Sequence, residues 1–104
     1  MNPPWRTATD MLARLRAGDI SSLELLEQHI QRVQQLDPAI NAVVVRDFDT
    51  ARQRARQADA AWRRGEHWGP LHGLPMTVKE SFDLPGTPTC WGFPEYKDNI
   101  AQQP

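Results

Sequence analysis

The fold of this chain depends on one stretch, Gly73-Leu74-Pro75-Met76-Thr77-Val78-Lys79. A short apolar run with β-branched residues is typical of a strand, and here it ends in a lysine. Only two of the 12 basic residues are lysines, Lys79 and Lys97; the others are arginines. A buried lysine can lose its proton, whereas an arginine stays charged. The position of Lys79 at the end of a strand, where α/β proteins place their reactive groups, suggests base chemistry. From the residues alone, the alternative that Lys79 is an ordinary surface charge stays open.

Composition limits what the chain can do. It has 104 residues, 39% of them hydrophobic, and a net charge of −1, so no overall field draws it to nucleic acid or to an anionic membrane. The single cysteine, Cys90, excludes an internal disulfide and fits a reducing compartment. The N-terminus has no apolar signal region, and no apolar run approaches the roughly 18 residues of a membrane span. These features predict a cytoplasmic protein that is one small domain or part of a larger one.

Residues 1–65 are predicted to be mostly helical. The first helix is expected over Ala8–Ala17, with a T-x-x-D start at Thr7 and a stop at Gly18. The second begins at a capping box, S-x-x-E, starting at Ser21, and ends before Pro38. The third is expected over about residues 49–64. Its apolar stripe is formed by Phe48, Ala51, Ala55, Ala58 and Trp62.

Two segments are predicted to be strands, residues 40–45 and 76–78. Val43, Val44 and Val45 are three β-branched residues in a row, which is typical of a strand buried on both faces. Residues 66–104 are rich in proline and glycine and are expected to combine short strands with loop. A strand, a helix and a second strand indicate an α/β fold, although two strands alone cannot make a stable sheet.

Other chemistries have weaker support in the sequence. His29, His67 and His72 lack the spacing of a metal site, so no metal is expected. The arginines of residues 49–64 alternate with acids and amides, and the tryptophans are far apart, so solvated and packing roles are expected and nucleic-acid binding is not. Cys90, Glu80 and Lys79 are the residue types of a nitrilase-like site, in which the cysteine would be the nucleophile. Because Lys79 and Glu80 are neighbours on an expected strand, they should point to opposite faces, and Cys90 is expected to be inert.

The stretch from Gly69 to Asp83 resembles the G-x-L-x-G-[IVL]-P-x-x-[IV]-K-[DE] segment of the amidase signature family. The continuation over residues 85–92, Pro-Gly-Thr-Pro-Thr-Cys-Trp-Gly, resembles the family's G-x-[PT]-T-x-x-G stretch. The helical part, with Pro38-x-Ile40-Asn41-Ala42, is also similar. The resemblance covers nearly the whole of residues 1–104 and matches the N-terminal portion of the family's domain.

The resemblance implies an α/β fold with a mixed sheet flanked by helices, and hydrolysis of carbon–nitrogen bonds in small amides by a Ser–cis-Ser–Lys triad without a cofactor. Lys79 matches the triad lysine, the base that accepts the proton of the nucleophile. The two serines belong to a downstream glycine- and serine-rich segment, whereas this sequence has only Ser21, Ser22 and Ser81. The chain is therefore expected to carry an incomplete fold and to be inactive alone. Its expected partner is the C-terminal part of the amidase fold, or other copies of itself.

An alternative remains open at this point. The helices of residues 1–65 can also serve as the partner-binding surface of a non-catalytic module, or the chain can be a remnant of an amidase.

The two serines at the start of the second helix differ in how much their removal is expected to destabilise it. Ser21→Ala should destabilise the second helix by about 1 kcal/mol, and Ser22→Ala by less.

Overall fold

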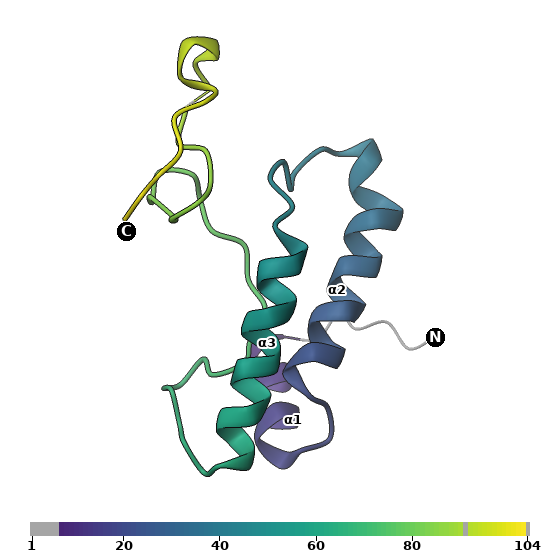
Figure 1. Cartoon of the computed structure of the whole chain (residues 1–104). Helices are drawn as coiled ribbons and strands as arrows, with labels where there is room; N and C mark the ends of the chain where they lie inside the picture. The colour runs from purple at the N-terminus through teal and green to yellow at the C-terminus, as the bar shows by residue number, and fades with distance from the viewer. Residues whose placement is uncertain (1–6, 91, 104) are drawn as a thin grey trace.

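The structure is a computed structural model that describes residues 7–90 and 92–103, and these residues form three α-helices. The helices are α1 (Ala8–Ala17), α2 (Ser22–Leu36) and α3 (Phe48–Arg63). Two short 3-10 helices, η1 (Asp37–Ala39) and η2 (Pro94–Tyr96), follow α2 and precede the C-terminus. In Figure 1, α2 and α3 lie side by side, α1 lies across their lower end, and residues after about 80 extend away from the helices.

The helix ends are where the sequence places them. The Thr7 side chain accepts a hydrogen bond from the Asp10 N–H, and Gly18 ends α1 in the left-handed conformation. At α2 the full capping box is present, because Ser21 Oγ accepts from the Glu24 N–H and Glu24 accepts from the Ser21 N–H. The Ser21 backbone N–H, and then its hydroxyl, hold the pKa of the Glu24 carboxyl below its ordinary value. The predicted starts of these helices are confirmed.

The core lies where the three helices meet. α2 packs against α3, and the buried apolar residues of α2 are Leu25 and Ile30. Leu15 of α1 is buried as well, and the alanine face of α3 is also buried. That face consists of Ala55, Ala58 and Ala61, and Ala61 was not among the residues predicted to form the stripe. Because alanine has no side chain beyond Cβ, α2 and the segment after α3 can approach the α3 backbone closely. This close approach positions the lysine segment described below.

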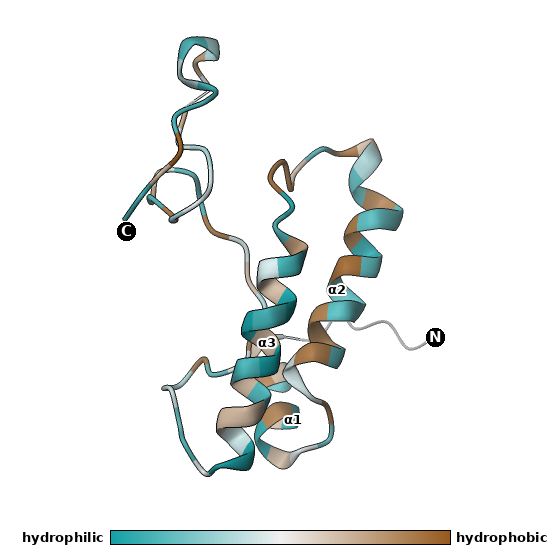
Figure 2. Cartoon of the chain, viewed as in Figure 1, coloured by the Kyte–Doolittle hydropathy of each residue, from teal (hydrophilic) through white to brown (hydrophobic). Residues whose placement is uncertain are grey.

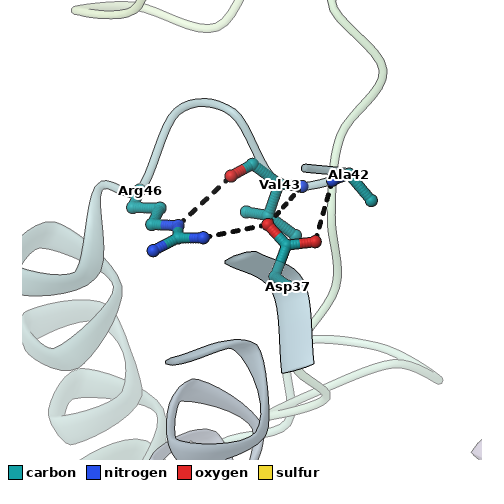
Figure 3. A network of polar contacts seen from close by, with 4 residues as sticks. All are labelled: Asp37, Ala42, Val43 and Arg46. Carbon is teal, nitrogen blue, oxygen red and sulfur yellow. Dashed lines mark hydrogen bonds and ion pairs between the residues drawn. The ribbon is translucent and has the colours of Figure 1, made fainter. Parts of the chain in front are cut away.

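The first predicted strand, residues 40–45, does not form. Figure 3 shows the reason: the Asp37 carboxylate accepts hydrogen bonds from the N–H groups of Ala42 and Val43 and from Arg46. Arg46 Nε in turn donates to the Val43 carbonyl. The N–H groups of Ala42 and Val43 and the Val43 carbonyl are therefore bound within the loop, and Asn41 adopts a left-handed φ of 57°. Val44 is 69% exposed instead of buried on two faces.

The second predicted strand, residues 76–78, is also absent, and no β-strand occurs among the residues that the structure describes. A strand needs a neighbour for its backbone groups, and no described segment pairs with Met76–Val78. The nearest feature to a sheet is an isolated antiparallel bridge between Pro88 and Ile100. Figure 2 shows hydrophobic residues on the loop that joins α2 to α3, where Val44 is exposed.

None of the helices formed by residues 7–90 and 92–103 is both long and apolar enough to cross a bilayer.

Candidate active site

The lysine segment, residues 73–79, is bound to the helices at its first residue and is exposed from residue 76 onward. Gly73 adopts a φ of +88°, which glycine tolerates and other residues rarely adopt. Its carbonyl accepts a hydrogen bond of 2.8 Å from Ser22 Oγ on α2, and Ser22 is only 4% exposed. A Cβ added at Gly73 would lie 3.4 Å from Ser22 Cβ and 3.6 Å from Leu15 Cδ1. The start of the segment is therefore held against α1 and α2 together.

A carboxylate from α3 completes this anchor. Asp59 Oδ1 accepts from the Ser22 N–H at 2.7 Å, and Asp59 Oδ2 accepts from the Leu23 N–H at 3.2 Å. These are N–H groups of the first turn of α2, which have no partner within the helix, and a carboxylate there also favours the helix dipole. From the sequence, Ser22 was expected only to form part of the start of α2. The structure shows that Ser22 links the start of α2 to the lysine segment.

Lys79 lies at the far end of the segment and is exposed. Among the residues that the structure describes, none forms a hydrogen bond or an ion pair with the Lys79 ammonium. The Lys79 carbonyl accepts from the Phe82 N–H at 3.0 Å, so the chain turns directly after the lysine. Met76 and Val78, which precede it, are exposed as well. In the described part of the chain, the segment therefore ends in an exposed lysine that follows exposed apolar residues.

The residues of the nitrilase-like alternative are only partly brought together. Glu80 Oε1 accepts hydrogen bonds from the Cys90 N–H at 2.7 Å and from Cys90 Sγ at 3.0 Å. Lys79 forms no hydrogen bond with either side chain in the described part of the chain. These contacts link residue 90 back to residue 80, across the loop that follows Lys79.

The three serines have distinct surroundings. Ser21 caps α2, Ser22 is bound to Gly73, and Ser81 is exposed two residues after Lys79. The first two hydroxyls are thus engaged in the helical part.

The histidines have structural partners. His72 is 4% exposed and lies between two parallel indole rings, with centroid distances of 4.2 Å to Trp62 and 4.6 Å to Trp68. His67 packs edge-on against Trp62, and His29 Nδ1 bonds to the Leu25 carbonyl. No group of three or more potential metal ligands occurs among the described residues. Trp5 and Trp91 lie outside them.

The arginines of α3 have partners of their own. Arg52 binds Glu27 on α2 and Asp49, and Arg54 binds Gln57 and covers the Trp68 ring at 4.2 Å from its centroid. A cation over an indole face is favourable, and here it extends the stack of Trp68, His72 and Trp62. These contacts are those of a partly solvated helix face.

An open groove of about 570 Å³ lies between the α2–α3 pair and residues 68–76. Its lining is mostly apolar, and it includes Leu26, Trp68 and Met76 together with the Arg54 side chain. The groove borders the lysine segment on the side of the helices, while Lys79 is not among its lining residues.

Comparison with known proteins identifies the family. The amidase family model matches residues 24–104. The indoleacetamide hydrolase of Bradyrhizobium diazoefficiens is 41% identical over 100 residues, which are 95% of this chain and 19% of that protein. The acylamidase of Rhodococcus erythropolis is 38% identical over 100 residues, which are 96% of this chain and 21% of that protein.

A solved structure agrees with this match. The crystal structure of a bacterial aryl acylamidase of the amidase signature enzymes superposes with a TM-score of 0.88 at 31% identity, over 94% of this chain and 20% of that chain. The chain belongs to the amidase family, and the resemblance found in the sequence is confirmed. It spans about a fifth of the length of these relatives.

Proposed function

We propose that this chain supplies the lysine of an amidase-type active site that hydrolyses carbon–nitrogen bonds in amides. The observation that carries the proposal is Lys79 itself, which occupies the lysine position of the family's segment and has an exposed, unpaired ammonium within the described residues. The nucleophilic serine and the bridging serine would come from polypeptide outside residues 1–104.

The chemistry would be acyl transfer. The nucleophilic serine would attack the amide carbonyl while its proton passes through the bridging serine to the neutral amine of Lys79. The tetrahedral intermediate would then expel the amine, which takes up that proton, and water would release the acyl group by the same route in reverse. Lysine acts as a base only when its amine is neutral, and burial beneath further polypeptide favours that form.

The substrate would be a small-molecule amide. The relatives include an indoleacetamide hydrolase and acylamidases, and these support an amide with an apolar acyl or amine part. Neither a metal nor an organic cofactor is part of the proposal. A cytoplasmic location remains a prediction that rests on the single cysteine.

The partner would be the remainder of the amidase fold, with residues 1–104 as its N-terminal part. The exposed apolar residues Ile40, Val44, Met76, Val78 and Phe82 support this, since they lie on the two segments predicted to be strands or close to them. If the remainder is absent, the same residues favour self-association. They would support a non-catalytic, partner-binding module equally well, which is why the test below compares Lys79 with a second lysine.

The experiment joins this chain to the remaining part of the Bradyrhizobium indoleacetamide hydrolase, in place of that enzyme's own matching segment. Lys79→Ala should abolish amide hydrolysis in the joined protein, whereas Lys97→Ala should leave it within about twofold of the parent. A Lys79→Ala variant that still hydrolyses amides at a rate within tenfold of the parent would exclude the base role.

A further inference from the structure

His72, which directly precedes the lysine segment, is held by two hydrogen bonds and by two stacked indole rings. Its Nδ1 lies 3.1 Å from the Trp68 backbone nitrogen, and its Nε2 lies 2.9 Å from the Ala58 carbonyl oxygen. A backbone N–H can only donate and a carbonyl can only accept, so Nδ1 is the acceptor and Nε2 carries the proton. The two backbone partners therefore select one neutral tautomer.

The stack restrains the ring in the remaining direction. The planes of Trp62 and Trp68 are each inclined by only 9° to the imidazole, and the two indoles cover both of its faces. Trp62 belongs to α3 and Trp68 to the loop that follows it, so the ring joins the helix to the loop. The two hydrogen bonds restrain the imidazole within its plane, and the two stacked indoles restrain it perpendicular to that plane.

The position of His72 in the chain makes this restraint relevant to Lys79. The next residue, Gly73, is the last one bound to the helices through its carbonyl, and the exposed course of the chain begins at Met76. The six residues that follow Gly73, up to and including Lys79, span up to about 20 Å when extended. A rotation of about 10° at the start of such a segment moves its end by about 3 Å, whereas catalytic groups must be placed within about 0.5 Å.

We propose that His72 is a positioning residue for Lys79. The imidazole, held between two indoles and bonded to α3, would set the direction in which the lysine segment leaves the helices. The catalytic significance of this rests on the proposed function, but the positional effect is a property of the chain itself. It is testable without any hydrolase activity.

The positional test measures the distance between two spin labels by pulsed electron resonance. The labels are attached at Lys79→Cys and at Gln28→Cys on the exposed side of α2, in a Cys90→Ser background that keeps a donor to Glu80. His72→Phe keeps an aromatic ring between the indoles but removes both hydrogen bonds. It should widen or shift the distance distribution by about 3 Å or more.

Two controls separate positioning from general loss of stability. His67→Phe alters a histidine that makes edge contacts, and Ser21→Ala weakens the start of α2 without removing a hydrogen bond of His72. Both should leave the distribution as in the parent. The proposal is overturned if His72→Phe also leaves it unchanged, or if the controls widen it equally. If His72→Phe does not fold by circular dichroism, His72→Asn, which retains an acceptor for the Trp68 N–H, is judged by the same criterion.

The kinetic test uses the joined enzyme. His72→Phe should lower kcat by about tenfold or more while KM stays within about twofold, because the base is misplaced and the substrate pocket is not. Unchanged kcat in His72→Phe, with Lys79→Ala inactive, overturns only the role of His72 in catalysis. Hydrolysis retained in Lys79→Ala overturns the proposed function, and the spin-label distances still decide the positional claim.

Discussion

The hydrogen bond from Ser22 to Gly73 predicts that Ser22→Ala destabilises the protein more than Ser21→Ala does. This is the reverse of the order expected from the sequence. Ser22→Ala removes the hydroxyl that donates to the Gly73 carbonyl at 2.8 Å in a site where Ser22 is 4% exposed. A typical hydrogen bond contributes about 1 kcal/mol, and a buried acceptor left without a donor costs about 1–3 kcal/mol. We therefore expect Ser22→Ala to lower the free energy of unfolding by about 2 kcal/mol. Ser21→Ala, which removes an exposed cap, should cost about 1 kcal/mol.

The assay is urea unfolding followed by circular dichroism at the helical band, with Ser81→Ala as the control. Ser81 is exposed, so its variant should stay within about 0.5 kcal/mol of the parent. In thermal melts a loss of 2 kcal/mol corresponds to roughly 8–16 °C for a domain of this size. A Ser22→Ala cost smaller than that of Ser21→Ala would refute the inference that Ser22 anchors the lysine segment.

Two further predictions concern the loop and the isolated chain. The N–H of Ala42, then Arg46 and the N–H of Val43, hold the pKa of the Asp37 carboxyl below its ordinary value, so the stability that Asp37 contributes is present above about pH 4 and is lost as the pH falls through its folded-state pKa. Asp37→Asn should therefore melt below the parent at pH 7, with a difference that narrows below about pH 4; a difference independent of pH would contradict this. The isolated chain should show no amide turnover above the blank, and it should bind a hydrophobic dye or elute as an oligomer, because residues such as Val44 and Met76 are exposed. A sharp monomeric melt without dye binding would instead favour a self-sufficient module.

The helices were predictable because their signals are local. Thr7, Ser21 and Gly18 are capping residues whose partners lie within four residues, so the sequence alone gives the starts of α1 and α2. The strands at 40–45 and 76–78 were wrong for this chain because β-propensity acts only where a neighbouring strand takes up the backbone groups. In residues 40–45, Asp37 binds the N–H groups of Ala42 and Val43, and Arg46 binds the Val43 carbonyl.

The site was predictable only in part. The motif identifies Lys79 as the candidate base, and its role remains a prediction. No pattern in the sequence indicates that Ser22 binds Gly73, 51 positions away, or that His72 lies between Trp62 and Trp68. Those contacts arise when α3 packs against α2 and the chain returns along it. They depend on tertiary structure, which no short pattern encodes.

The most direct test of the account is amide hydrolysis by the joined enzyme and its two lysine variants. Lys79 and Lys97 are both exposed, but only Lys79 lies in the family's segment. We predict that the joined enzyme hydrolyses an amide substrate, that Lys97→Ala retains its kcat/KM within about twofold, and that Lys79→Ala loses at least a thousandfold without a change in its circular dichroism spectrum. Hydrolysis by Lys79→Ala within tenfold of the parent, or an equal loss in both variants, would contradict the assignment of Lys79 as the base.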